Sequence, residues 1–163
     1  MEDERGWMRV LRFLISLLLP LLVGAAGGWA TAQGVQDWYP GLTKPSFNPP
    51  SWVFGPVWTL LYVLMGLAAF LVWEEGVRSP GVRKALTIYG VQLLLNGLWS
   101  FVFFAAEAPG WAFLELLVLL AFLIWTTVLF FRIRTLAGWL LTPYLLWVTF
   151  AGVLNFAIWF LNG

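Results

Sequence analysis

Five long apolar runs constrain this chain more than any other feature. Of its 163 residues, 61% are hydrophobic and only 10% are charged, whereas an ordinary soluble domain carries about 25% charged residues. Each run is close to the ~20 residues that an α-helix needs to cross the hydrocarbon core of a membrane. We therefore predict an all-α integral membrane protein with spanning helices at residues 10–32, 51–73, 84–105, 110–131 and 136–161.

The connections between these runs are short, apart from the first. Short connections favour a compact bundle in which successive helices are mostly antiparallel neighbours. We therefore expect residues 1–163 to form a single transmembrane domain. No internal repeat is evident, and an odd number of helices argues against a transporter built from inverted halves.

Basic residues indicate the orientation of the bundle. Lys44 is the only Lys or Arg outside the N-terminal segment, the second loop and the fourth loop, and cytoplasmic loops carry the excess of such residues. We predict a bacterial cell-membrane protein with a cytoplasmic N-terminus, and with the first loop and the C-terminus outside. The sequence Ala30-Thr31-Ala32 imitates a signal-peptide cleavage site, but the apolar run before it exceeds the usual ~7 to 15 residues.

The chain contains no Cys and no His. Thiolate and imidazole metal sites, axial His or Cys ligation of haem, and Ser-His or Cys-His nucleophiles are therefore excluded. The net charge of +1 does not indicate nucleic-acid binding, which is typical of strongly basic proteins. We predict no metal site, no covalent cofactor, no nucleic-acid partner and no conventional catalytic residues.

The first connection is rich in tryptophan and proline. The stretch from Trp38 to Tyr62 reads WYPGLTKPSFNPPSWVFGPVWTLLY, and its prolines fix φ and remove backbone donors. We predict a semi-rigid lid, residues 33–50, between the first and second helices. Trp38, Trp52 and Trp58 place flat surfaces at its edge, which suits a pocket for a flat apolar ligand.

Aromatic and amide side chains recur on single helix faces below this lid. Amides at membrane depth need partners, so they either bond neighbouring helices or orient the polar edge of a ligand. Aromatic walls suit stacking on a planar conjugated molecule. The faces comprise Gly55, Trp58 and Tyr62 in the second span, Gln92, Asn96 and Trp99 in the third, and Trp147, Ala151, Leu154 and Asn155 in the fifth.

Glu115 is the only acidic residue within an apolar run. Carboxylates inside the membrane often belong to functional sites, so Glu115 could be a proton relay or a ligand contact. Alternatively its carboxylate reaches back to interfacial water. Both interpretations stay open.

The motifs resemble one known family along nearly the whole chain. They are Trp38-Tyr39, Lys44-Pro45-Ser46-Phe47-Asn48-Pro49-Pro50, Trp52, Pro56-Val57-Trp58, Leu61-Tyr62, Met65-Gly66, Gln92-Leu93, Asn96, Trp99, Phe103-Phe104, Pro143-Tyr144-Leu145, Trp147, Phe150-Ala151 and Leu154-Asn155. The pattern is similar to the tryptophan-rich sensory protein and translocator protein family, also called the peripheral benzodiazepine receptor family.

This resemblance implies a five-helix bundle that forms homodimers and binds porphyrins such as protoporphyrin IX. It also implies binding of isoquinoline carboxamide and benzodiazepine ligands. Trp58 and Trp147 match tryptophans implicated in porphyrin photodegradation by bacterial relatives. By position, the family's pocket maps to Gly27, Gly28, Trp52, Gly55, Trp58, Asn96, Trp99, Trp111, Trp147, Ala151 and Leu154.

Two departures qualify the resemblance. The family's cholesterol motif needs a Tyr and a following basic residue near the C-terminus, but this chain has Phe156 and no Lys or Arg after Arg134. Mitochondrial members carry Trp-His before the paired prolines, where this chain has Phe47-Asn48. The sequence therefore resembles bacterial members of the family more than mitochondrial ones.

Three functions follow from the sequence. The leading one is a tetrapyrrole-binding membrane protein that acts as sensor, scavenger or transporter. The second is a light- and oxygen-dependent enzyme that degrades porphyrin with Trp58 and Trp147. The third is a scaffold that binds lipid, sterol or a partner protein, in which the glycines pack helices.

Overall fold

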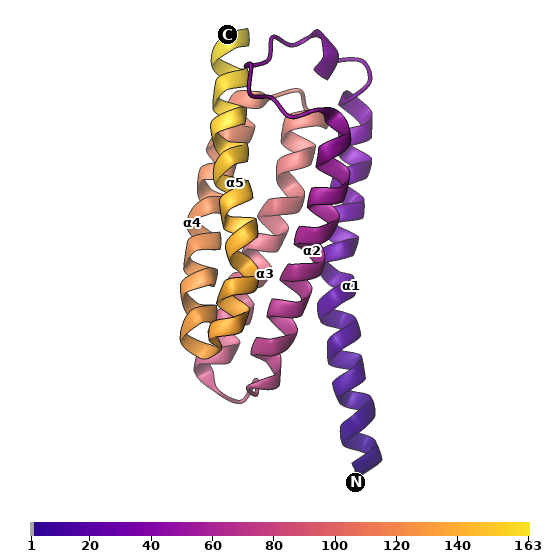
Figure 1. Cartoon of the computed structure of the whole chain (residues 1–163), viewed down its shortest axis with the longest axis vertical. Helices are drawn as coiled ribbons and strands as arrows, with labels where there is room; N and C mark the ends of the chain where they lie inside the picture. Colours follow the sequence, from indigo (N-terminus) through magenta and orange to yellow (C-terminus); the bar gives the residue numbers. More distant parts are fainter. Residues whose placement is uncertain (1) are drawn as a thin grey trace.

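The computed structural model describes residues 2–163, with the side chains of residues 6–163, as a bundle of long helices (Figure 1). Five of these helices are long and apolar enough to cross a membrane, which confirms the predicted all-α membrane fold. They are α1 (Glu2–Gly34), α2 (Ser51–Glu74), α3 (Pro80–Ser100), α4 (Pro109–Ile133) and α5 (Thr135–Asn162).

The helices extend somewhat beyond the predicted spans. The first begins at Glu2 instead of residue 10, because the polar N-terminal segment continues the helix past its apolar run. The third begins at Pro80 instead of residue 84, where the missing N–H of proline costs no helical hydrogen bond. Its last turn, η2 (Phe101–Ala105), is a π-helix, and such a turn changes the direction of the side chains that follow.

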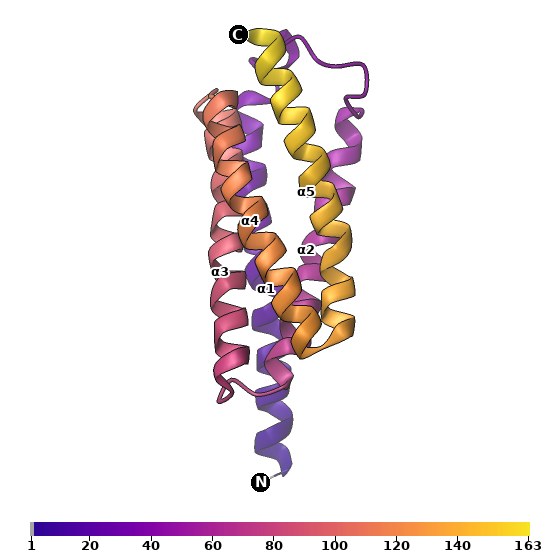
Figure 2. The ribbon, with the colours of Figure 1, turned by 90° about the vertical axis from the view of Figure 1, so that its left-hand side faces the viewer.

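The five helices pack as a closed ring in the order α1, α2, α5, α4, α3. Figure 2 shows α3 on one side of the bundle and α2 with α5 on the other. Successive helices are close neighbours in every case except α2 and α3, which make few contacts. Successive helices are therefore mostly neighbours, as expected, and the exception arises because α1 lies between α2 and α3 in the ring.

Ion pairs tie the helices together at the end that holds the N-terminus. Arg9 Nε lies 2.7 Å from Glu74 Oε2, and Arg12 Nη1 lies 3.6 Å from the other oxygen of that carboxylate. Arg134 Nη1 lies 3.1 Å from Glu75 Oε1. The lid and the C-terminus lie at the opposite end (Figure 1). These three ion pairs therefore lie at the end of the bundle away from the lid.

Inside the lid, which covers residues 35–50 in the structure, Tyr39 is the central buried side chain. Its hydroxyl donates to Asn48 Oδ1 at 3.0 Å, and Lys44 Nζ lies 4.7 Å from its ring centroid. Burial raises the pKa of the Tyr39 hydroxyl above its ordinary value, although the hydrogen bond to Asn48 lowers it in part. The hydroxyl therefore stays protonated at neutral pH and keeps its role as donor.

The lid is also attached to the last turn of α5. Thr43 N–H donates to Asn162 Oδ1 at 2.9 Å, and Asn162 Nδ2 donates back to Thr43 O at 2.9 Å. A side-chain amide thus satisfies both backbone groups of one lid residue. Phe47 packs on Phe150 of α5 with ring centroids 6.4 Å apart. These contacts hold the lid against the bundle.

A buried polar network joins α2, α3 and α5 near the middle of the bundle. Tyr62 Oη donates to Asn96 Oδ1 at 2.7 Å, and Asn96 Nδ2 donates to Tyr144 Oη at 2.9 Å. Tyr144 Oη donates in turn to Gln92 Oε1 at 3.1 Å. All four side chains are buried. Because a hydrocarbon environment offers no water as a substitute partner, this network fixes the relative positions of three helices.

We predict that Asn96→Leu lowers the free energy of unfolding, by roughly 1 to 2 kcal/mol, because it leaves the Tyr62 and Tyr144 hydroxyls short of partners. Thermal unfolding in detergent measures the change. Thr149→Val, at an exposed position on α5, is the control and should have little effect. Adding Tyr62→Phe to Asn96→Leu should cost less than the sum of the two single changes. Strict additivity, or no loss in Asn96→Leu, would contradict the structural role of the network.

Candidate functional site

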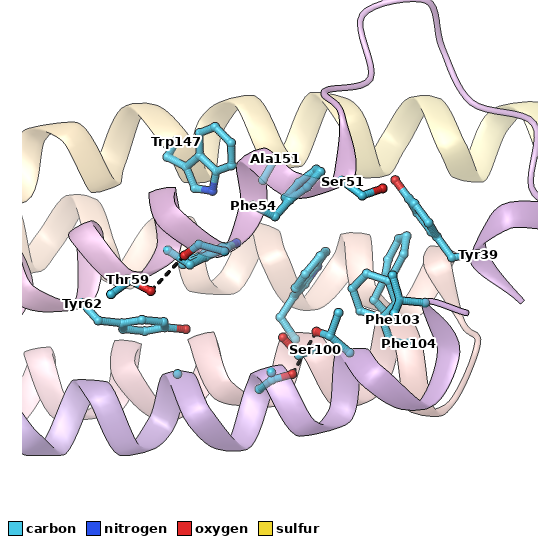
Figure 3. Close-up of a pocket in the computed structure, with 18 of the residues that line it drawn as sticks. Tyr39, Ser51, Phe54, Thr59, Tyr62, Ser100, Phe103, Phe104, Trp147 and Ala151 are labelled. Atoms are coloured by element: carbon cyan, nitrogen blue, oxygen red, sulfur yellow. Dashed lines mark hydrogen bonds between the residues drawn. The ribbon is translucent and has the colours of Figure 1, made fainter. Parts of the chain in front are cut away.

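The lid-side half of the bundle encloses a cavity of about 540 Å³. Its walls come from α1, α2, α3, α5, the π-helical turn η2 and the lid. Figure 3 shows Trp147, Phe54 and Ala151 on one side of this space, with Ser100 and Phe103 across from them. A cavity of this size falls within the range of small-molecule sites in proteins.

Trp58 is the centre of the wall formed by α2 and α5. Its ring stacks on Tyr62 with centroids 5.6 Å apart, and it meets the ring of Trp147 at 90° with centroids 6.4 Å apart. Phe54, one turn earlier on α2, meets Trp147 edge-on at 6.0 Å. The buried network holds Tyr62 from behind through its hydroxyl. The aromatic surface is therefore built on a fixed support.

Trp99 forms the centre of the facing wall. Its ring stacks on Phe103 with centroids 5.0 Å apart. Its Nε1 donates to Asn155 Oδ1 at 3.0 Å, and Asn155 Nδ2 donates to Pro109 O at 2.8 Å. The orientation of this indole is thus set by α5 and by the start of α4. The π-helical turn brings Phe103 and Phe104 into the same wall.

Small residues of α1 form the third wall. Gly24, Ala25, Gly27, Gly28 and Thr31 line the cavity from this helix. A Cβ at Gly27 would lie 3.1 Å from Ser100 Oγ, so a larger residue would crowd α3. This wall leaves room between the two aromatic walls.

Hydroxyl groups provide most of the polarity. Thr31 Oγ1 donates to Gly27 O at 2.9 Å, and Thr59 Oγ1 donates to Gly55 O at 2.9 Å. Each hydroxyl oxygen keeps lone pairs that can accept from a ligand. Among the described residues, no charged side chain lines the cavity. The arrangement can stack a flat ring and bind a few polar edge groups, but it offers no strong acid or base.

Most of the residues predicted for the site meet in this cavity. The residues that line it are Gly27, Gly28, Gly55, Trp58, Tyr62, Trp99, Trp147, Ala151, Leu154 and Asn155. Their contact with a ligand stays a prediction.

Five predicted residues lie outside the cavity. Trp52 and Trp111 are 76% and 72% exposed on the outer surface, where indoles suit the membrane interface. Trp38 packs edge-on against Phe103 at 5.7 Å, behind the cavity wall. Gln92 and Asn96 belong to the buried network, which favours the interpretation that these amides bond neighbouring helices.

Sequence reasoning missed several lining residues. Phe54 and Ile158 lie one helical turn from Trp58 and Leu154, so helical spacing could have found them. Tyr39, Phe103 and Phe104 depend on the lid and on the π-helical turn, which periodicity does not reveal. The others are small or aliphatic: Leu21, Gly24, Ala25, Thr31, Val35, Ser51, Thr59 and Ser100.

Glu115 lies on α4 and does not line the cavity. Both of its carboxyl oxygens are buried, and neither has a hydrogen-bond partner among the described residues. The carboxyl group therefore does not reach the protein surface in this structure. A direct contact with a ligand in the cavity is not supported.

Comparison with known proteins gives a consistent result. Residues 16–160 match the model of the TspO/MBR family. The tryptophan-rich protein TspO of Archaeoglobus fulgidus is 43% identical over 95% of this chain and 99% of its own length. The human translocator protein is 39% identical over 94% and 89%, and the tryptophan-rich sensory protein of Cereibacter sphaeroides is 39% identical over 96% and 92%. With its five membrane-spanning helices and its aromatic cavity, this chain belongs to the TspO/MBR family.

Proposed function

We propose that this membrane protein binds a tetrapyrrole, protoporphyrin IX, in the aromatic cavity and acts as a sensor, scavenger or transporter for it. The observation that carries the proposal is a cavity of about 540 Å³ with indole rings on two facing walls and, among the residues whose side chains the structure describes, no charged lining residue. Flat conjugated molecules gain from offset stacking and edge contacts with such rings. A relative bears the name tryptophan-rich sensory protein, which fits a sensing role.

The same cavity suits other flat apolar ligands. Isoquinoline carboxamide and benzodiazepine compounds combine aromatic rings with one or two carbonyl acceptors. The rings would lie against Trp58 and Trp147, and any hydroxyl that turned from its helix carbonyl, such as that of Thr59, could donate to a carbonyl oxygen.

We further propose a homodimer in a bacterial cell membrane, with the basic loops and the N-terminus in the cytoplasm.

We expect protoporphyrin IX to quench tryptophan fluorescence saturably, because several indoles line the cavity. Ala151→Leu should weaken binding roughly tenfold or more, because overfilling a packed space costs about 1 to 3 kcal/mol. Fluorescence titration of the purified protein in detergent measures both effects.

The matched control is Ala121→Leu, which makes the same change at an exposed position on α4 and should leave the affinity unchanged. If wild type shows no saturable quenching, the tetrapyrrole proposal fails. If Ala151→Leu and Ala121→Leu bind equally well, the ligand occupies a different site.

A second candidate function is the photo-oxidative degradation of bound porphyrin. The perpendicular contact of Trp58 and Trp147 favours it, because both rings belong to the cavity wall and could donate an electron to an excited ligand. Molecular oxygen would be the oxidant: the reduced porphyrin would pass its electron to O2, and the reactive oxygen so formed would attack the macrocycle.

Illumination of the complex in air separates this activity from binding alone. We expect porphyrin absorbance to decay faster with the wild-type protein than in detergent without protein. With the Trp58→Phe/Trp147→Phe variant, the decay should be no faster than in detergent alone. The control pair, Trp125→Phe/Trp139→Phe, changes two exposed indoles outside the cavity. Equal decay with and without protein would rule out the enzyme.

A further inference from the structure

We infer that the ligand enters the cavity sideways from the lipid, through an opening between α1 and α2, while the lid stays closed. This inference rests on the proposed ligand binding and adds its route. It assigns a role to Gly28 of α1 and Gly55 of α2, which both line the cavity and are both exposed. The packing of α1 against α2 changes along the bundle.

Near the middle of the bundle, α1 and α2 are in direct contact. A Cβ at Gly66 of α2 would lie 2.8 Å from Leu17 Cα and from Ser16 O of α1. A Cβ at Gly24 of α1 would collide with the ring of Tyr62. Only glycine permits this approach, so α1 and α2 are closely packed at Gly24 and at Gly66.

Beyond Gly24 toward the lid, the two helices separate. A Cβ at Gly28, one turn further along α1, would meet nothing within 4 Å, and the same holds for Gly55 of α2. Gly24 thus serves close helix packing, whereas Gly28 does not. The cavity-lining residues that are exposed gather on these two helices: Ala25 and Gly28 on α1, and Ser51, Gly55 and Thr59 on α2.

The opening lies within the membrane-spanning part of both helices. At a rise of 1.5 Å per residue, Gly28 lies about 9 Å from the end of α1 at Gly34. Trp29, which follows Gly28 on α1, is 63% exposed, and Trp52, three residues before Gly55 on α2, is 76% exposed. Exposed indoles mark the membrane interface. The opening therefore faces lipid just inside that interface, at the lid end of the bundle.

The lid offers no comparable passage. Moving it would break the two hydrogen bonds between Thr43 and Asn162 and would separate Phe47 from Phe150. It would also expose the ring of Tyr39, which packs on Phe104 at 5.6 Å. Entry between α1 and α2 requires none of these changes.

The rim also restricts what can pass. Ala25, Gly28, Ser51, Gly55 and Thr59 are all small, so a thin ring system can enter by its edge. A molecule already dissolved in lipid reaches this rim without passing through water. The route therefore selects flat, membrane-soluble ligands before they touch Trp58 or Trp147.

The absence of cysteine from the chain allows a reversible block. We propose Gly55→Cys, labelled with benzyl methanethiosulfonate and later released with a reductant. The probe is protoporphyrin IX carried in phosphatidylcholine vesicles, mixed by stopped flow with the protein in vesicles of the same lipid, and followed by tryptophan quenching. Labelling should slow association severalfold, and reduction should restore the rate in the same sample.

Gly90→Cys is the matched control, because a Cβ there also meets nothing within 4 Å but the position lies on α3, outside the cavity. Its labelling should not alter the rate. Asn162→Ala removes both hydrogen bonds between the lid and α5 and should leave association unchanged in unlabelled protein.

Two results would overturn the lateral route. One is an unchanged rate in labelled Gly55→Cys, and the other is faster association in Asn162→Ala than in wild type. Either result with saturable equilibrium quenching leaves tetrapyrrole binding intact and removes only the route. Absence of quenching in wild type would instead remove the proposed function itself.

Discussion

The structure depends on one constraint, which is that the polar side chains joining its helices at membrane depth have no water to bond and therefore bond one another. The network of Tyr62, Asn96, Tyr144 and Gln92 meets this constraint by joining three helices through direct hydrogen bonds. Because each of these hydrogen bonds joins two different helices, α2, α3 and α5 cannot slide past one another at the level of the network. The cavity lies on the lid side of this level, and the ring of Tyr62 belongs to both.

The same constraint explains why the cavity is so apolar. The Trp99 indole N–H is bonded to Asn155, and the Asn155 amide is bonded to the Pro109 carbonyl. Thr31 and Thr59 bond their own helices. These polar groups are satisfied before any ligand arrives, and what remains facing the cavity is mostly ring surface. Recognition must therefore depend mainly on shape and stacking, with hydroxyl oxygens and the indole N–H of Trp147, unpartnered among the described residues, as the polar groups open to a ligand.

The sequence predicts the helices well and the site in part. Hydropathy locates all five spans, because length and apolar character alone decide them. Helical spacing places Trp58 with Tyr62, and Trp147 with Ala151, on shared faces. It cannot choose the partners of Gln92 and Asn96, which depend on Tyr144 arriving from a distant helix. Nor can it separate Trp52, which points outward, from Trp58, which lines the cavity.

Other features arise only from packing. The π-helical turn at Phe101–Ala105 directs Phe103 and Phe104 into the wall, although hydropathy treats it as ordinary helix. The opening between α1 and α2 depends on where two glycines permit contact and where two others face empty space. Gly24 and Gly28 lie one helical turn apart on the same face of α1, so the sequence alone does not distinguish a packed glycine from an open one.

A structure of the protein with bound protoporphyrin IX in a lipid environment would show directly whether the aromatic cavity is the ligand site. We predict that the macrocycle lies between the Trp58–Trp147 wall and the Trp99–Phe103 wall, above Tyr62. One edge should point toward the gap between α1 and α2, and the contact between Thr43 and Asn162 should be intact. A porphyrin bound on the outer surface, for example against the exposed rings of Trp52 or Trp111, would contradict it.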